Sequence, residues 1–114
     1  VSFALADSLQ ALAATGAHLD RLIAIGGGSQ SELWLQMLAT VLNLPLDLPA
    51  QGEFGAAMGA ARLARCAATG EDPDVVMTPP DIARTIQPRT DLVPAYAETR
   101  AAWAKIYPVL KDIT

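Results

Sequence analysis

Cysteine, basic residues and long apolar runs are all scarce in this sequence. Its 114 residues include a single cysteine, Cys66, so no internal disulfide can form. A lone thiol on a helix face that we expect to be buried suits a reducing compartment. The formal net charge is −4, and without a basic stripe nucleic acid is not expected as a partner.

Membrane and export signals are missing as well. No apolar run reaches the roughly 18 residues of a membrane-spanning helix. The first residues lack the basic segment that precedes the apolar part of a secretory signal. We therefore expect a cytoplasmic protein that binds neither membrane nor nucleic acid.

Apolar residues make up 52% of the chain. Some segments space them as a helix does, and others as a strand does. The expected order is helix, short buried strand, helix, strand, helix, irregular excursion and helix, over residues 1–14, 21–25, 29–42, 46–48, 54–68, 71–94 and 95–107. This alternation predicts an α/β fold with parallel strands and right-handed crossovers. Two strands are too few to cover three apolar helices, and Val1 lies inside a predicted helix. We therefore expect a piece of a longer polypeptide.

Several helix boundaries have specific signals. Ser29 begins a capping-box pattern, with Ser29 as the N-cap and Glu32 at the third helical position. Gly16, Asn43 and Gly70 are suited to end helices, because glycine and asparagine tolerate left-handed backbone. Pro108 is expected to end or kink the last helix.

Two further segments are unusual in composition. Residues 71–94 are rich in proline and acidic residues, so we expect an irregular excursion with at most short helical turns at 81–85. The helix at 54–68 is rich in small residues. Gly55 and Gly59 each cost it about 0.5–1 kcal/mol relative to alanine. Another helix, a sheet or a ligand is therefore expected to approach its backbone closely.

One arrangement carries chemistry: a strand, then Gly26-Gly27-Gly28, then a capped helix. Glycines allow a sharp turn and a close approach of ligand to backbone, and a helix start presents free N–H groups and a positive dipole end. Phosphate is the natural ligand. A tight turn with no ligand explains the glycines equally well.

Three phosphate-binding schemes compete for this turn. A Walker A loop is excluded, because no Gly-Lys-Ser/Thr follows the glycines. A dinucleotide fingerprint fails at its third glycine, where Ser31 stands, although Asp47 lies where a ribose acid is expected. As an alternative, Asp47 is a solvent-facing strand residue. The adenosine loop of actin-like ATPases, an apolar strand ending in glycines before a helix, fits best.

The resemblance to a known family is specific at these residues. Residues 25–39 read IGGGSQSELWLQMLA and 54–64 read FGAAMGAARLA. Both segments resemble the carbohydrate kinases of the FGGY family, and the residues around these motifs are most similar to the bacterial xylulokinase group. Residues 1–7 and 14–16, and the closing aromatic residues Tyr96, Trp103 and Tyr107, resemble the same group.

The resemblance implies a partial ribonuclease-H-like, actin-like ATPase lobe with short parallel strands and flanking helices. It implies that residues 1–114 are a C-terminal nucleotide-binding lobe fragment, with the excursion at about 71–94. The reaction implied is transfer of the γ-phosphoryl group of ATP, with Mg²⁺, to D-xylulose. The sugar and the catalytic base aspartate would belong to the N-terminal lobe of the same chain, so no catalytic residue or metal ligand is expected here.

The residues implied to bind nucleotide are those around the glycine turn. Gly26, Gly27 and Gly28 would lie with their backbone near the phosphates and ribose. Ser31 stands where many relatives carry a polar residue that reaches the adenine, and Gln30 is a neighbouring candidate. Glu53 is a further residue to consider near the nucleotide, or a complement to the dipole of the next helix.

Alternative functions remain open at this point. The chain could belong to another FGGY sugar kinase, to a non-catalytic nucleotide-binding or interaction module, or to a dinucleotide-binding half domain. His18 is expected to be an ordinary surface residue. An exposed apolar face and an open sheet edge would favour association, so a homodimer is also considered.

Overall fold

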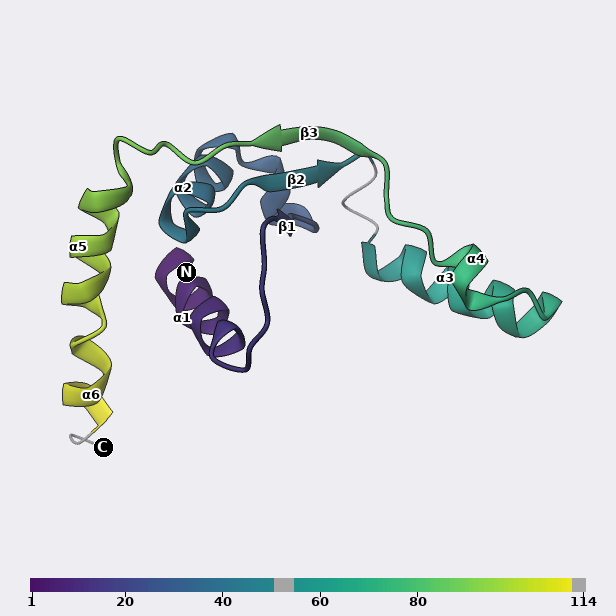
Figure 1. Ribbon diagram of the computed structural model, residues 1–114, viewed down its shortest axis with the longest axis horizontal. Helices are drawn as coiled ribbons and strands as arrows, with labels where there is room; N and C mark the ends of the chain where they lie inside the picture. Colours follow the sequence, from purple (N-terminus) through teal and green to yellow (C-terminus); the bar gives the residue numbers. More distant parts are fainter. Residues whose placement is uncertain (51–54, 112–114) are drawn as a thin grey trace.

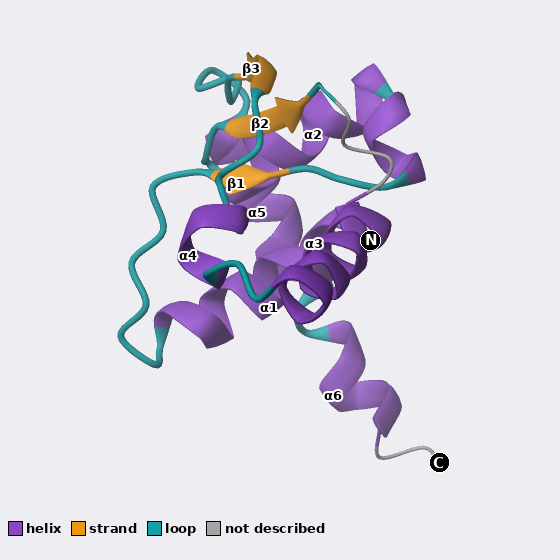
Figure 2. Ribbon diagram, turned by 90° about the vertical axis from the view of Figure 1, so that its right-hand side faces the viewer, coloured by secondary structure: helices purple, strands orange, loops and turns teal. Residues whose placement is uncertain are grey.

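A small mixed sheet organises the chain. The computed structural model describes residues 1–50 and 55–111. The strands β1 (Leu22–Ile23), β2 (Leu46–Pro49) and β3 (Ile82–Ile86) lie in that order in the sheet, as Figure 2 shows. β1 and β2 are parallel, with Leu22 opposite Leu46, whereas β3 runs antiparallel to β2, with Thr85 opposite Asp47.

The helices connect and flank these strands. In chain order they are α1 (Ser2–Ala13), a 3-10 turn (Gly27–Gln30), α2 (Glu32–Leu42), α3 (Gly55–Thr69), α4 (Pro73–Val76), α5 (Val93–Trp103) and α6 (Ile106–Lys111). Among the described residues, none of the helices has the length and apolarity needed to cross a bilayer.

The core lies where α2 packs on the sheet. Leu35, Leu38 and Ala39 of α2 meet Leu46 and Leu48 of β2 and Ile86 of β3, all buried. Burying one leucine side chain fully stabilises a fold by about 1.5–3 kcal/mol. This cluster therefore fixes α2, and the turn that precedes it, against β2 and β3.

The expectation of an irregular segment at 81–85 was wrong, because β3 forms there. Antiparallel pairing with β2 gives the backbone of this segment its hydrogen-bond partners. Ile86 at its end is buried in the core, while residues 82–85 are exposed. One buried residue in five gives no period-2 pattern, so the strand has no clear signal in the sequence. The sheet is consequently mixed rather than wholly parallel.

The start of α2 differs from the predicted capping box. The N-cap is Ser31, whose Oγ accepts from the N–H of Trp34 at 3.3 Å. Ser29 instead lies inside the 3-10 turn and is buried, and its Oγ donates to the carbonyl of Gly26 at 2.7 Å. The predicted end is confirmed, since α2 stops at Leu42 and Asn43 adopts φ 51°.

β1 was expected to be a buried strand over 21–25, and this was wrong in extent and burial. Only Leu22 and Ile23 pair as a strand. Ile23 is 50% exposed and Ile25 is 54% exposed, because β1 is the outer strand of the sheet as described.

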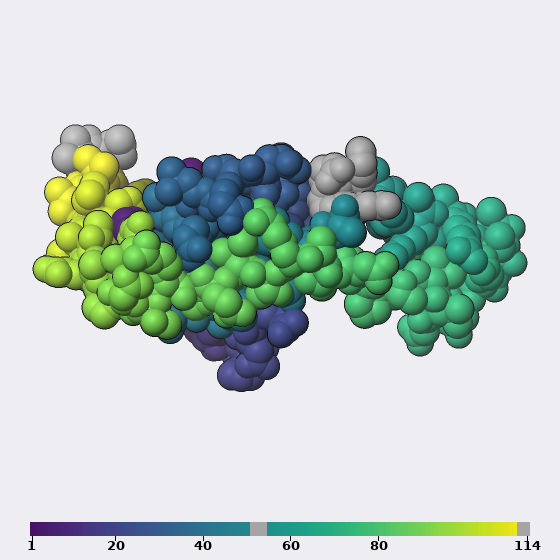
Figure 3. All heavy atoms as spheres, turned by 90° about the horizontal axis from the view of Figure 1, so that it is seen from above, coloured from purple at the N-terminus to yellow at the C-terminus, as the bar shows by residue number. Residues whose placement is uncertain are grey.

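Helices α3 and α4 form an arm that projects from the sheet, as Figures 1 and 3 show. The radius of gyration is 17.6 Å, whereas a compact chain of this length has one of about 13 Å. No residue of α3 is buried. Cys66 is only partly buried, so its predicted place in the core was wrong. Gly70 ends α3 with φ +71°, as predicted.

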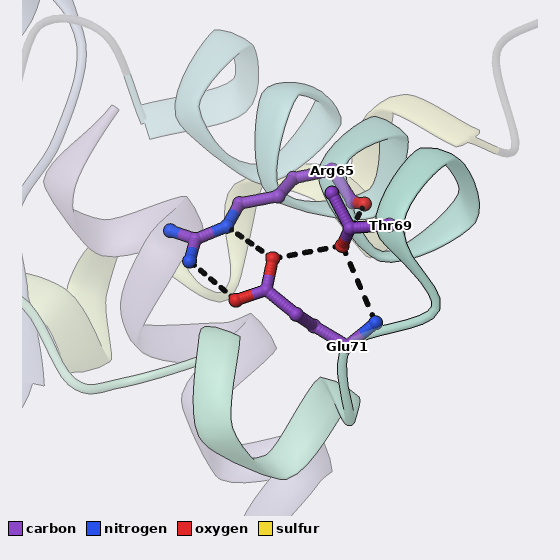
Figure 4. Close-up of polar contacts among 3 residues, drawn as sticks. All are labelled: Arg65, Thr69 and Glu71. Atoms are coloured by element: carbon purple, nitrogen blue, oxygen red, sulfur yellow. Dashed lines mark hydrogen bonds and ion pairs between the residues drawn. The ribbon is translucent and has the colours of Figure 1, made fainter.

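The arm is held together by polar contacts near the end of α3. Arg65 donates to both carboxylate oxygens of Glu71, at 2.8 and 2.5 Å, and Thr69 Oγ1 donates to Glu71 at 2.7 Å (Figure 4). Arg62 Nη1 also donates to the carbonyl of Thr78 at 2.8 Å. These contacts tie α3 to the segment that contains α4.

Helix α5 closes the opposite end of the molecule against α1. The rings of Phe3 and Trp103 have centroids 5.7 Å apart, and Arg100 Nη2 donates to Asp7 at 2.6 Å and to Gln10 at 2.8 Å. The single helix predicted at 95–107 was wrong, because α5 ends at Trp103 and α6 begins at Ile106. α6 contains Pro108 rather than ending at it, and projects away from the rest (Figure 2).

Candidate functional site

The glycine turn leaves β1 and reverses the chain into α2. Gly26 has φ 85° and ψ −180°, a conformation that is essentially restricted to glycine. Its carbonyl accepts from the N–H of Ser29 at 3.0 Å as well as from the Ser29 hydroxyl. A Cβ on Gly28 would lie 2.8 Å from the ring of Trp34, whereas one on Gly27 would meet nothing within 4 Å. Gly26 and Gly28 thus have structural reasons to be glycine, and Gly27 has none within the described chain.

The turn lies at the carboxyl ends of β1 and β2. In open α/β sheets this is the edge at which ligands bind. Gln30 is exposed, and Ser31 is exposed with its Oγ accepting from the N–H of Trp34. The structure therefore brings all five predicted nucleotide-binding residues together on one edge of the sheet.

Two cavities adjoin this edge. The smaller has a volume of about 210 Å³, and its described lining includes Ser29, Gln30, Ala24, Ala50 and Arg84. The larger, of about 400 Å³, lies between the end of β1 and the arm, where its described lining includes Ile25, Gly55, Met58, Gly59 and Arg62. Gly26, Gly27, Gly28 and Ser31 are not among the described lining residues of either cavity.

The helix rich in small residues, α3, was expected to have another element or a ligand close to its backbone, and this is found at one of its two glycines. A Cβ on Gly55 would lie 2.7 Å from Cδ1 of Ile25, so α3 comes close to the segment after β1 there. At Gly59 a Cβ would meet nothing within 4 Å, and Gly59 instead lines the larger cavity. Glu53 lies outside the described residues.

Asp47 occupies a different place from the one expected. Its side chain is 2% exposed, so the prediction of a solvent-facing residue was wrong. Its carboxylate accepts from Arg21 Nη1 at 2.9 Å and from Thr85 Oγ1 at 2.5 Å. These bonds join β2 to β3 and to the residue before β1, which is a structural role. The engaged carboxylate removes the support for Asp47 as a ribose ligand.

Arg84 was not predicted as a site residue from the sequence, although it is the one cationic residue in the described lining of the smaller cavity. It extends from β3 to Glu32 at the start of α2, with Nη2 and Oε2 2.6 Å apart. The only signal available would have been the strand at 82–86, which itself was not predicted.

Other candidate residues have ordinary surroundings. His18 is 89% exposed and lies 3.0 Å from Asp20, as expected of a surface residue. Within residues 1–50 and 55–111, no group of three or more His, Cys, Asp or Glu side chains is arranged to hold a metal ion. The pKa of Glu71 is lowered to about 2 by hydrogen bonds from Arg65 and then Thr69, but this group lies on the arm, away from the glycine turn.

The site thus consists of a strand, a glycine turn and a capped helix at the carboxyl end of parallel strands, with cavities beside them, which is an arrangement that binds phosphate in many α/β proteins. The C-terminal domain of the FGGY family of carbohydrate kinases matches residues 1–68 of this sequence. The chain therefore belongs to the FGGY family of carbohydrate kinases.

Relatives match along nearly the whole chain. The xylulose kinase of Escherichia coli K12 is 35% identical over 111 residues, which cover 96% of this chain and 23% of that protein. The autoinducer-2 kinase of Salmonella typhimurium LT2 is 32% identical over 106 residues, 90% of this chain and 20% of that protein. This chain thus spans about a quarter or less of the length of these relatives.

Solved structures agree with the fold. The crystal structure of a xyloylose kinase from Brucella ovis superposes with a TM-score of 0.86 at 48% identity, covering 99% of this chain and 24% of that one. The xylulose kinase of Rhodospirillum rubrum superposes with a TM-score of 0.77 at 24% identity. The predicted fold class, part of an actin-like kinase lobe, is confirmed.

Proposed function

We propose that this chain is the ATP-binding part of a carbohydrate kinase, with residues 1–114 forming a C-terminal nucleotide-binding lobe fragment. The observation that carries the proposal is the turn at Gly26, Gly27 and Gly28, at the carboxyl ends of β1 and β2, in a chain of the FGGY family. The kinase transfers the γ-phosphoryl group of ATP to a sugar hydroxyl. The catalytic base and the sugar contacts belong to an N-terminal lobe outside these residues.

The glycine turn would hold the phosphates through its backbone. The first N–H groups of a helical turn have no partner within it, so those of Gly27 and Gly28 are the natural donors. The open space around the Cα of Gly27 is where a ligand reaches the backbone. Gln30 lines the adjoining cavity, and Ser31 contributes to binding by fixing the start of α2.

Mg²⁺ would arrive with the nucleotide, where it neutralises phosphate charge. The described residues of this chain offer it no cluster of acidic ligands, so its protein ligands would lie elsewhere in the kinase. We further propose a cytoplasmic location, and a homodimer as the assembly to test first.

D-xylulose is the proposed substrate, since several similar proteins are named xylulose kinases. The similarity to autoinducer-2 kinases favours one second candidate, a kinase of the same family that acts on another substrate. A non-catalytic nucleotide-binding module is the third.

A coupled kinase assay on the complete gene product, with MgATP and a sugar panel led by D-xylulose, tests these proposals. Turnover selective for D-xylulose supports the first. Turnover on another sugar moves the substrate to the second candidate, and none on any sugar, with ATP binding retained, favours the third.

A substitution isolates the role of the turn. Gly27→Ala adds a methyl group to open space without backbone strain, so we expect ATP affinity to fall about tenfold while the thermal midpoint stays unchanged. His18→Ala, at an exposed residue in the loop before β1, is the control and should change neither. Unchanged ATP affinity in Gly27→Ala would contradict a close approach of the nucleotide to this backbone.

A further inference from the structure

An ion pair stands beside the glycine turn and joins two elements that are distant in sequence. Glu32 is the first residue of α2, and Arg84 lies in the middle of β3. Their Oε2 and Nη2 atoms are 2.6 Å apart. The Arg84 side chain is 51% exposed and that of Glu32 is 62% exposed, so water reaches both groups.

Arg84 also lines the cavity of about 210 Å³, together with Ser29 and Gln30 of the turn. Among the described lining residues of this cavity it is the only one with a charged side chain. The Arg84 side of the ion pair is therefore part of the wall of the space next to the predicted nucleotide site, and Glu32 is its partner at the start of α2.

Glu32 would oppose a nucleotide if it stood alone. An acidic side chain in the first turn of a helix is favoured by the helix dipole, which accounts for its presence there. The same carboxylate lies one residue after Ser31, however, and like charges near one another repel in proportion to their charge. A nucleotide carries several negative charges, so the cost would grow with the number of phosphates.

We propose that Arg84 sets the affinity of the glycine turn for the phosphates of a nucleotide by neutralising Glu32. This inference rests on the proposed function and adds a residue to it. In this proposal Arg84 acts through Glu32 and does not contact the nucleotide. Its role is to neutralise the carboxylate that would otherwise repel the phosphates. The pair is exposed, and its effect is therefore moderate and sensitive to salt.

The exposed ion pair is expected to matter little to folding. Pairs between exposed side chains contribute little to stability. Loss of Arg84 should therefore change ligand binding without unfolding the sheet, and this separation makes the proposal testable.

The experiment is a double-mutant cycle in the complete gene product. The dissociation constants of MgATP and of adenosine, which has no phosphate, are measured by calorimetry for the wild type, Arg84→Gln, Glu32→Gln and the double variant. We expect Arg84→Gln to weaken MgATP about 3- to 10-fold and to leave adenosine unchanged. The double variant should regain the wild-type affinity, because the uncompensated carboxylate is gone.

Two further measurements sharpen the result. Arg84→Lys keeps the charge and should bind MgATP as the wild type does. The loss in Arg84→Gln should shrink as salt is raised from about 0.05 to about 0.5 M, since the screening length falls several-fold.

Three outcomes would overturn the proposal. Equal weakening of MgATP and adenosine would make Arg84 structural. A double variant as weak as Arg84→Gln would mean that Arg84 touches the phosphates itself, and unchanged MgATP affinity in Arg84→Gln would leave it no role. A wild type that binds neither ligand would refute the proposed function as well, and is recognised before any variant is compared.

Discussion

Replacing Arg21 with alanine removes the cation that pairs with the buried carboxylate of Asp47. The two side chains differ sharply in exposure, at 66% for Arg21 and 2% for Asp47. After the substitution Thr85 remains as a partner of the carboxylate, through Oδ1. The remaining charge would therefore be buried with one hydroxyl donor.

The two single substitutions, Arg21→Ala and Asp47→Asn, should lower the free energy of unfolding by different amounts. Removing one partner so that a buried charge loses its compensation costs about 3 kcal/mol or more, and Arg21→Ala does this. Asp47→Asn leaves an exposed guanidinium that water solvates, and the amide oxygen still accepts from Thr85, so about 1 kcal/mol is expected. The exposed residue is thus predicted to be the more costly one to change, by about 2 kcal/mol, or roughly 30-fold in an equilibrium constant.

Amide hydrogen exchange measures this difference locally. The N–H of Ala24 donates to the carbonyl of Asp47 at 2.9 Å, and that of Leu22 donates to Pro45 at 3.1 Å. In the complete gene product, exchange at residues 22–24 should be about 30-fold faster in Arg21→Ala than in Asp47→Asn. The double variant should exchange more slowly than Arg21→Ala, because no buried charge remains. Equal rates in the two single variants would refute the reasoning, since they would mean that the carboxylate is not effectively buried.

Three further predictions concern other parts of the chain. The pKa of Glu71 is lowered from 4.5 to about 2, chiefly by the Arg65 hydrogen bond. This contribution to arm stability is therefore present above about pH 4.5 and is lost as pH falls through about 2. Exchange at residues 65–72 between about pH 6 and about pH 2 should show the loss, and Glu71→Gln should lack it. Gly26→Ala should cost about 1–3 kcal/mol in urea unfolding, because its φ of 85° is unfavourable for alanine; no change in the urea midpoint would exclude strain. Thr40→Val removes the acceptor of the Arg89 N–H, now bonded at 3.1 Å, and should cost about 1–3 kcal/mol. Thr40→Ser, which keeps the hydroxyl, should be nearly neutral.

The parts of the fold that follow from local pattern could be predicted from the sequence. Helix α2, its end at Asn43 and the glycine turn were found because periodicity, a left-handed residue and consecutive glycines act within a few residues. Strand β3 could not be found in that way. It is held by pairing with β2, in which Leu46 lies opposite Ile86 and Pro49 opposite Ile82, and a single buried residue, Ile86, gives no alternation to detect.

The difference between local sequence signals and contacts between distant residues also explains which site residues could be predicted. The residues of the turn, from Gly26 to Ser31, are consecutive, and the family resemblance identifies them without a structure. Arg84 and the partners of Asp47 come from elements that meet only in the folded sheet. The cap also escaped prediction, because Ser29 and Ser31 both match the composition of an N-cap, and the 3-10 turn decides between them.

The distribution of burial connects these observations to function. The core cluster fixes α2 to β2 and β3. It therefore keeps the start of α2 and Arg84 in a fixed position relative to each other. The larger cavity lies instead between the end of β1 and the projecting arm, where Ile23 and Ile25 are half exposed and no residue of α3 is buried. Few buried apolar contacts mean a low free energy of local opening. The phosphate side of the proposed site is therefore rigid by construction, whereas its α3 side depends on contacts made by a ligand or by the rest of the kinase.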